Sequence, residues 1–492
     1  MTNKTAVIIG SGIAGMAAAI RLAVKGYTVN VYEKNSYPGG KLSSFEQDGY
    51  HFDAGPSLFT QPQNIEELFT LAGERMEDHF QYRPVDIACR YFYENGKIIN
   101  AYTDPDKFAE ELKRQVNEDP QAVIKYLKKS KRLYENVGTV FINNPLHKRN
   151  TWLNKSIGKA MMTVRLPYLY NTLQEYNNKH FSRPETVQLF NRFATYNGSN
   201  PYKAPAMLSL IPHLEQNEGV FFPAGGMISI TNAVYSLAKA KGVRFHFDAP
   251  VQRIIYHEGT VRGVVVEDKN ILSSIVVSNA DVYLTYNYLL GNTGKAKRII
   301  KQERSSSAVV FYWGIKKQFP QLFLHNLFFS SDYKKEFSGI FVKNQISDDP
   351  TVYINITSKM ETTQAPERCE NWFVMVNVPS NTGQDWEQLT AVLRKNVLTK
   401  LSRVLGENIE QLIETEHTTD PVKIGEQSGS FMGSIYGSSS NSRMSAFLRH
   451  ANYSNNIKGL YFCGGTVHPG GGIPLCLKSA KITSDLISED KQ

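Results

Sequence analysis

The chain has 492 residues but few cysteines, and it shows no clustered metal ligands. Its four cysteines are Cys89, Cys369, Cys463 and Cys476; they form no Cys-x-x-Cys pair, and no histidines gather beside them. This spacing argues against a zinc site, a redox dithiol and a disulfide framework. We therefore expect four thiols buried among apolar side chains, and no bound metal.

Long apolar runs are also missing. Runs such as residues 308–313 fall far below the roughly 18 residues that a membrane-spanning helix needs. The first apolar strand begins at about residue 5, so we expect no signal peptide and a cytoplasmic protein. Because the length exceeds what one core usually supports and 41% of the residues are hydrophobic, we expect two globular domains.

Acidic residues are absent from residues 136–174, in a chain whose net charge is +9. The positive charges of this segment are Lys148, Arg149, Lys155, Lys159 and Arg165. The apolar side chains between them are Leu146, Trp152, Leu153, Ile157, Met161, Met162, Val164, Leu166 and Tyr168. This pattern is typical of an element that lies in a membrane interface, although a helix packed on the protein's own core with a basic edge explains it equally well. The sequence shows no nucleic-acid-binding motif, so we expect no nucleic acid as a partner.

Near the N-terminus the chain carries a glycine motif in the context of a βαβ unit. Residues 6–15 read AVIIGSGIAG, and Glu33 follows the next apolar run. In a dinucleotide-binding fold, Gly10 permits a tight turn, Gly12 leaves room for a pyrophosphate, and Gly15 lets the helix pack closely on the strand. Glu33 is then placed to accept hydrogen bonds from ribose hydroxyls. An ordinary strand-to-helix turn explains the glycines alone, but not an acid in register.

The residues after Glu33 indicate which dinucleotide binds. A second glycine pair, Gly39-Gly40, precedes Lys41. A nicotinamide dehydrogenase has no need of this pair, whereas an extended FAD does, and Lys41 can neutralise a phosphate. A surface turn would explain the pair by itself. A second Gly-x-Gly-x-x-Gly between a strand and a helix is absent, so we expect electrons to leave the flavin to a quinone or oxygen and not to bound NAD.

Further motifs are spread over nearly the whole chain. They are residues 55–57 (GPS), 193–205 (FATYNGSNPYKAP), 222–227 (FPAGGM), 277–281 (VSNAD) and 463–474 (CGGTVHPGGGIP). Together with the N-terminal unit they resemble the bacterial-type phytoene desaturase family of carotenoid desaturases. The ending HPGGGIPL is more similar to the hydroxycarotenoid 3,4-desaturase branch of that family than to the phytoene branch.

The resemblance implies an FAD-dependent oxidoreductase that introduces C=C bonds into an acyclic or hydroxylated carotenoid by hydride transfer to flavin, with 1-hydroxycarotenoid 3,4-desaturation favoured. The alternatives are phytoene desaturation and carotenoid cis–trans isomerisation on the same fold. A cofactor-free chaperone would have little use for the complete phosphate loop, and an amine oxidase does not share the central motifs. Because a lipophilic polyene is drawn from a bilayer, the resemblance favours peripheral membrane association through residues 136–174.

The residues expected to contact FAD come partly from the motifs and partly from the resemblance, which places Pro56 and Ser57 near the isoalloxazine and Val251 at the adenine. They are Gly10, Gly12, Ile13, Ala14, Gly15, Glu33, Lys34, Gly40, Lys41, Leu42, Gly55, Pro56, Ser57, Val251, Asn279, Gly464, Gly465, Ile473 and Pro474. His468 is the candidate catalytic base, and a turn or packing residue is the alternative.

The element pattern predicts an α/β fold with a flavin amine-oxidase-like architecture. A Rossmann-like FAD-binding domain is expected from residues 1–75, 220–290 and 457–492, interleaved with a mixed α+β substrate and membrane-associating domain from residues 76–219 and 291–456. Expected helices cover residues 106–116, 120–137, 184–193, 229–241 and 475–487. Expected strands cover residues 243–247, 261–267, 274–278, 307–315, 351–356, 372–378 and 459–463.

Overall fold

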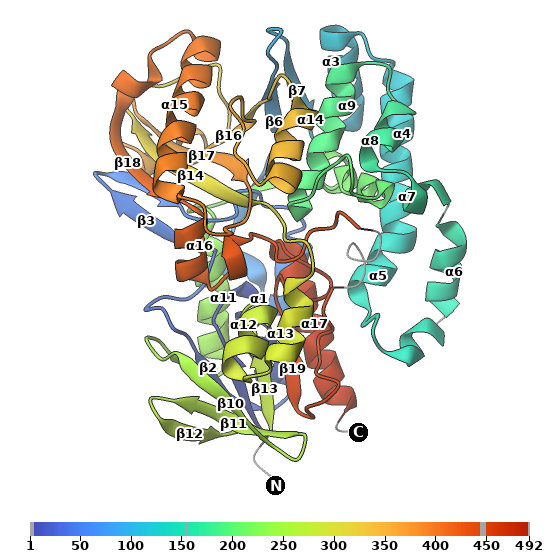
Figure 1. Ribbon diagram of the computed structural model, residues 1–492, viewed down its shortest axis with the longest axis vertical. Coiled ribbons are helices and arrows are strands. Elements are labelled where there is room, and N and C mark those ends of the chain that lie inside the picture. Colours follow the sequence, from blue (N-terminus) through green and yellow to red (C-terminus); the bar gives the residue numbers. More distant parts are fainter. Residues whose placement is uncertain (1–3, 154, 165, 443–448, 491–492) are drawn as a thin grey trace.

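A computed structural model describes residues 4–153, 155–164, 166–442 and 449–490 (Figure 1). Five strands form a parallel sheet in the order β19-β13-β1-β2-β9. The strands are β1 (Thr5–Ile9), β2 (Thr28–Tyr32), β9 (Arg244–His246), β13 (Ile275–Ser278) and β19 (Leu460–Phe462). The sheet therefore combines segments from the start, the middle and the end of the sequence.

Alternate residues of β1 point to opposite faces of this sheet, as the period of a strand requires. Ala6 and Ile8 pack against a helical layer, whereas Val7 and Ile9 pack against a second, smaller sheet and the helices beside it. The helical layer is α1 (Ile13–Val24), α2 (Gln63–Leu71), α11 (Ile228–Ala240) and α17 (Ile473–Glu489). The smaller sheet is β10 (Val251–His257), β11 (Thr260–Val266) and β12 (Lys269–Leu272). Both faces are thus covered, which is why the central strands β1 and β13 are mostly apolar and buried, whereas the edge strand β9 is not.

Helix α1 is buried on all sides over its first three turns, from Ile13 to Leu22. The helix lies against α2, α11 and α17, so even Arg21 is buried. Small residues, Ala17 to Ala19 above all, allow this close packing.

A seven-stranded sheet forms the other half of the molecule, in the order β18-β14-β17-β16-β15-β6-β7. Its strands are β6 (Ile87–Phe92), β7 (Ile98–Tyr102), β14 (Ser307–Ile315), β15 (His325–Phe328), β16 (Val352–Ile356), β17 (Glu370–Val378) and β18 (Ile413–Thr419). The neighbours are antiparallel except β15 and β6. One face, which includes Phe311 and Trp313, packs against α15 (Trp386–Leu405). The residues between them, Val310 and Tyr312, point to the opposite face.

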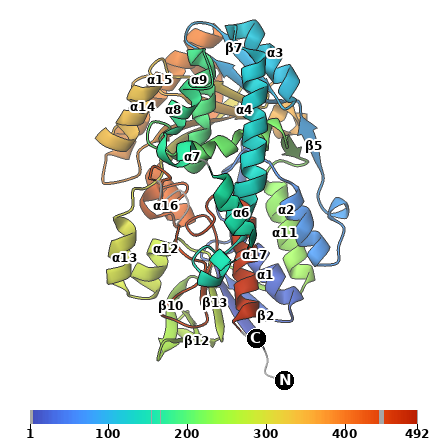
Figure 2. The same ribbon diagram turned by 90° about the vertical axis from the view of Figure 1, so that its right-hand side faces the viewer.

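Helices α3 (Pro105–Val116), α4 (Pro120–Leu133), α8 (Leu173–Asn178) and α9 (Pro184–Asn191) pack beside β6 and β7 (Figures 1 and 2). The first two begin with the same device. Asp104 accepts a hydrogen bond from the backbone of Lys107, Asp119 accepts one from Gln121, and a proline follows each aspartate at the first helical position. Such caps satisfy free N–H groups, and proline there costs no hydrogen bond.

The remaining elements are mostly short. The strands are β3 (Ser44–Gln47), β4 (Tyr50–Asp53), β5 (Tyr82–Val85) and β8 (Val220–Pro223). The helices are α5 (Thr139–Asn143), α6 (Lys155–Thr163), α7 (Leu166–Tyr170), α10 (Pro212–Gln216), α12 (Val282–Leu284), α13 (Thr293–Ile300), α14 (Tyr333–Ser338) and α16 (Pro421–Ser428). Across the described ranges, every helix is too short or too polar to cross a bilayer.

Several predicted elements differ from the observed ones. The predicted helix 120–137 ends as an α-helix at Leu133 and continues as one π-helical turn over 134–138. Strand β10 was not predicted, because Ile254 is its only fully buried residue and its apolar residues do not alternate with polar ones. Two of the four thiols, Cys369 and Cys476, are only half-buried, which corrects the expectation of four buried cysteines. The predicted domain boundaries stay a prediction.

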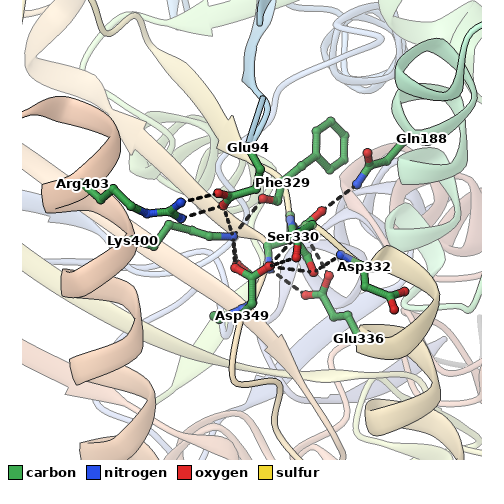
Figure 3. Close-up of polar contacts among 12 residues, drawn as sticks. Glu94, Gln188, Phe329, Ser330, Asp332, Glu336, Asp349, Lys400 and Arg403 are labelled. Carbon is green, nitrogen blue, oxygen red and sulfur yellow. Dashed lines mark hydrogen bonds and ion pairs between the residues drawn. The ribbon is translucent and has the colours of Figure 1, made fainter. Parts of the chain in front are cut away.

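A buried polar network fastens α15 to the seven-stranded sheet (Figure 3). Lys400 on α15 donates hydrogen bonds to the carbonyls of Phe329 and Pro350, both at 2.8 Å, and lies 2.6 Å from an Asp349 oxygen. Nearby, Glu336 on α14 accepts hydrogen bonds from the backbone N–H and the hydroxyl of Thr351. Burial raises the pKa of the Glu336 carboxyl to about 7, so α14 contains a buried carboxyl group that titrates near neutrality.

Candidate cofactor and substrate cavity

A cavity of about 1150 Å³ lies between the two large sheets. Its wall contains all but one of the residues expected to contact FAD, and it also contains His468. The exception is Gly15, which does not line the cavity. A Cβ at Gly15 would collide with the carbonyl oxygen of Gly10, so this glycine permits close packing behind the loop, and its contact with FAD stays a prediction. The fold therefore collects residues from positions 9 to 476 around one space.

The first βα turn is shaped for a phosphate group. Gly10 has a φ of +91°, a conformation that favours glycine. A Cβ at Gly12 would lie 2.7 Å from Asn279 Nδ2, so a side chain there would fill the approach to the turn. Helix α1 begins at Ile13, and its free N–H groups are at the cavity wall. These features fit the pyrophosphate of a dinucleotide.

Glu33 is held at the carboxyl end of β2. Its carboxylate accepts hydrogen bonds from the Ser11 N–H at 2.7 Å, the Ser11 hydroxyl at 2.9 Å and the Asn35 N–H at 3.0 Å. A carboxylate has about four acceptor positions, so a position remains for a ribose hydroxyl. Glu33 is buried but lines the cavity, which suits this role.

Lys41 and Lys34 both reach across to the segment after β18. Lys41 Nζ donates to the carbonyl of Ile435 at 2.7 Å, and Lys34 Nζ donates to the carbonyl of Glu426. Burial lowers the pKa of Lys41, and the charge of Asp281 opposes that effect. The Lys41 side chain is accessible from the cavity, and an ammonium group at a cavity wall favours an anionic ligand such as a phosphate.

Arg449 is a cavity residue that sequence reasoning missed. Its buried guanidinium donates from Nη1 to the carbonyls of Tyr436 at 2.6 Å and Gly465 at 3.1 Å. Burial lowers its pKa to about 10, and no carboxylate among the described residues forms an ion pair with it. Nothing in the local sequence marks this arginine, because only the fold brings it to the Gly464-Gly465 turn.

The C-terminal turn leads into α17. Gly464 has a φ of +107°, Gly472 is the N-cap, and Pro474 stands in the first turn of the helix. Ile473 and Pro474 line the cavity, so the positive end of a long helix faces it. Together with Lys41 and Arg449, this end gives the cavity a positive side that fits the anionic groups of FAD.

The part of the cavity under the seven-stranded sheet is largely apolar. The sheet contributes Val310, Met375 and Leu327, and the helical side contributes Phe141, Leu146, Leu208, Ile211 and Leu214. Such a lining suits a long polyene chain. The apolar lining and the expected cofactor residues belong to one continuous cavity, so no wall separates them.

Four of the polar side chains in the cavity wall contact one another in two pairs. Arg192 Nη2 lies 2.9 Å from both carboxylate oxygens of Glu215, and Tyr353 Oη lies 2.7 Å from His325 Nδ1. Tyr353 Oη is also 2.8 Å from Ser57 Oγ. Burial and the charge of Arg192 lower the pKa of His325 to about 3. Sequence reasoning missed these residues because each stands alone in its segment and they meet only in the fold.

His468, the candidate base, is buried at the cavity wall. Its Nε2 lies 2.9 Å from the carbonyl oxygen of Asn144 and donates to it. Burial lowers its pKa to about 4, so the imidazole is neutral at physiological pH. The side chain thus joins the C-terminal turn to the end of α5, and its role as a base stays a prediction.

The basic segment forms several short helices and not the single element that its spacing suggested. On the right of Figure 1, α5, α6 and α7 form the outer edge of the molecule, and α6 faces the viewer in Figure 2. Leu153, Met162 and Leu166 are 82%, 89% and 68% exposed. Lys148 is paired with Glu489 and Asp490, whereas Arg149 and Lys155 are exposed. Arg165 and the side chain of Lys159 lie outside the described residues.

Comparison with known proteins supports the same assignment. Residues 13–488 match the family model of flavin containing amine oxidoreductases. The chain is 48% identical over 484 residues to 1-hydroxycarotenoid 3,4-desaturase of Flavobacterium sp. (strain P99-3), covering 98% of this chain and 99% of that protein. It is 32% identical to 4,4'-diapolycopene oxygenase of Methylomonas sp, covering 100% and 99% of the two chains.

Solved structures agree on the fold. An oxidoreductase from Methanosarcina mazei matches with a TM-score of 0.65 at 14% identity, covering 99% of this chain and 100% of the other. Cyclohexylamine oxidase from Brevibacterium oxydans IH-35A matches with a TM-score of 0.62 at 16% identity, covering 99% of each chain. The chain therefore belongs to the flavin containing amine oxidoreductases, within their carotenoid desaturase group, and is an FAD-dependent oxidoreductase.

Proposed function

We propose that the protein desaturates an acyclic carotenoid that carries a hydroxyl group at C1, and forms the double bond between C3 and C4. The observation that carries this proposal is the 48% identity, over nearly the full length of both chains, to a protein with that activity. The cavity supports it, since expected FAD contacts and an apolar lining meet in one space of about 1150 Å³.

The reaction removes two hydrogen atoms from neighbouring carbons. When bound, FAD supplies the hydride acceptor, and a quinone or oxygen then takes up the electrons. Loss of a hydride beside a polyene leaves a cation that the polyene delocalises, and the adjacent carbon then loses a proton. The chain's own task is to hold the reacting carbons in place and to exclude water, for which the apolar lining from β14, β15 and β17 is suited.

His468 is our candidate for the proton acceptor. Its Nε2 donates to Asn144, which leaves the Nδ1 lone pair as the basic site. A pKa of about 4 makes His468 a weak base, but a proton beside a carbocation is strongly acidic and a weak base suffices.

We also propose that the substrate enters from a membrane through the segment of residues 136–174. The inner side of this segment lines the cavity with Val137, Phe141 and Leu146, while Leu153 and Met162 are exposed on its outer side. Apolar side chains on both sides of one thin segment would give a polyene a continuous apolar route.

Incubation of the FAD-loaded protein with liposomes tests the proposal. One set carries a 1-hydroxylated acyclic carotenoid and a matched set carries the same carbon chain without the hydroxyl. Loss of two hydrogen atoms and a red shift with the hydroxylated substrate support it. Conversion of phytoene instead would place the enzyme at an earlier desaturation, and an unchanged mass with an altered spectrum would indicate isomerisation. Oxygen incorporation is a further outcome to test, because the relative from Methylomonas sp is an oxygenase.

A further inference from the structure

Four buried polar side chains that line the cavity, Arg192, Glu215, His325 and Tyr353, are named the polar wall. They come from separate elements: residues 192–197, α10, β15 and β16. The same lining contains the apolar side chains of Leu208, Ile211, Leu214 and Leu327. A charged pair and a neutral imidazole in such surroundings cost free energy unless they have partners.

Arg192 is held rigidly and has donor capacity left. The side chains of Arg192 and Glu215 are 8% and 1% exposed. Arg192 uses Nη2 for both oxygens of Glu215, while its buried Nε has no hydrogen-bond partner within the described residues. The rings of Phe193 and Tyr196 lie 4.9 and 5.2 Å from the guanidinium carbon and fix its position.

The hydrogen bonds of His325 determine where its proton lies. Asn355 Nδ2 donates to the Leu324 carbonyl, which fixes the orientation of the amide, and lies 3.1 Å from His325 Nδ1. Tyr353 Oη is 2.7 Å from the same nitrogen. The Asn355 amide nitrogen can only donate, so Nδ1 is the acceptor, and the neutral ring carries its proton on Nε2. That buried N–H has no partner among the residues that the structure describes.

The polar wall therefore combines free N–H donors with a carboxylate. An alcohol is the group that uses both, because its oxygen accepts a hydrogen bond and its O–H donates one. A ketone has no O–H to donate to the acceptor positions of Glu215 that Arg192 leaves open, and a hydrocarbon end pairs with none of these groups. Buried polar groups left unpaired are the reason that a site built for a hydroxyl rejects the analogue that lacks it.

We propose that the polar wall binds the hydroxyl group of the substrate, and that this contact selects hydroxylated carotenoids and sets which carbon–carbon bond reacts. The inference rests on the proposed function. In a 1-hydroxycarotenoid the hydroxyl-bearing carbon is two bonds from C3, so its binding site must adjoin the reacting carbons. Ser57, which is expected near the isoalloxazine, is joined to Tyr353 by a hydrogen bond, and Tyr353 is joined to His325.

The test is a ratio of two rates in the FAD-loaded protein: kcat/KM for the hydroxylated carotenoid divided by kcat/KM for the same chain without the hydroxyl. The double variant Arg192→Met/Glu215→Leu replaces the pair by apolar groups and leaves no lone buried charge. We expect its ratio to fall about 10²-fold or more, with the rate on the non-hydroxylated chain unchanged or raised. His325→Leu should also lower the ratio, and His325→Gln, which keeps an N–H donor, should lower it less.

Lys400→Met provides the matched control, because Lys400 is a buried cation that does not line the cavity; its polar contacts are shown in Figure 3. It should change both rates by the same factor and leave the ratio intact. Equal losses on both substrates in the polar-wall variants would overturn the inference, since a structural role predicts that result. A wild-type protein that acts on neither substrate would overturn the proposed function instead.

Discussion

The exposed side chains of residues 136–174 allow a quantitative prediction for membrane binding. We expect the triple variant Leu153→Ser/Met162→Ser/Leu166→Ser to bind liposomes much more weakly than the wild type. These side chains are 82%, 89% and 68% exposed, so nearly all of their apolar surface is available to enter a bilayer. The same substitutions should leave the folded core intact.

The expected loss follows from the exposed area. Burying a whole Leu or Met side chain yields at least about 1.5 kcal/mol, so three side chains exposed to this degree contribute about 4 kcal/mol. At about 1.4 kcal/mol per tenfold change, the partition coefficient should fall about 10³-fold. The apolar contribution should persist in high salt. By contrast, Arg149→Gln/Lys155→Gln should cost about fivefold per charge in low salt and little in 1 M salt.

Flotation with liposomes of anionic and neutral lipid measures both effects. Leu272→Ser is the control, because Leu272 is 75% exposed on β12, far from α6 in Figure 1. It should bind like the wild type. Equal binding by the triple variant and the wild type would refute the membrane role of this segment. A loss as large in the control would show that exposed apolar area anywhere on the molecule is sufficient.

The remaining predictions concern the interior. Gly15→Ala places a Cβ against the Gly10 carbonyl oxygen, so the variant should lose FAD on gel filtration, as measured by flavin absorbance. Full retention of FAD would contradict this prediction. His468→Gln should lower kcat about 10²–10⁴-fold at nearly constant KM, and an unchanged kcat would exclude His468 as the base. Glu336 has a folded pKa of about 7 against 4.5 unfolded, so its stabilisation is complete below pH 4.5 and lost as pH rises through 7. In urea unfolding, the free energy of unfolding of Glu336→Gln relative to that of the wild type should therefore rise by about 3 kcal/mol between about pH 4.5 and 8. A difference between the two proteins that does not change with pH would refute this prediction.

The sequence predicted best the elements whose pattern is local. Strand β14 was predicted with its observed ends. Its nine consecutive buried residues, among them Phe311 and Trp313, form a mostly apolar run that is rich in β-branched and aromatic side chains and favours a strand over a helix. The glycines after β1 predicted the turn for a similar reason, since Gly10 needs a positive φ whatever surrounds it. Strand β10 was missed because only Ile254 is fully buried in it. The position of this strand is set by its pairing with β11, which the local sequence does not show.

The candidate site divides along the same line. Glu33 was found because it stands at a fixed distance from the glycines, at the end of the next strand. Arg449 and His325 were missed because their roles depend on residues far away in sequence, Gly465 for the one and Tyr353 for the other. Periodicity and motif spacing carry no information about such contacts between separate segments. The contacts arise only when the two sheets enclose the cavity.

The packing of α17 against α1 has a consequence for how the protein is made. A ribosome releases the phosphate-binding turn early, but the helix that completes the wall of the cavity, beginning at Ile473, emerges hundreds of residues later. Until then the apolar face of α1 that receives Leu477 and Ala480 has no cover. Cofactor capture is therefore a late event in biosynthesis, and a nascent chain interrupted before α17 should be colourless and a substrate for chaperones and proteases.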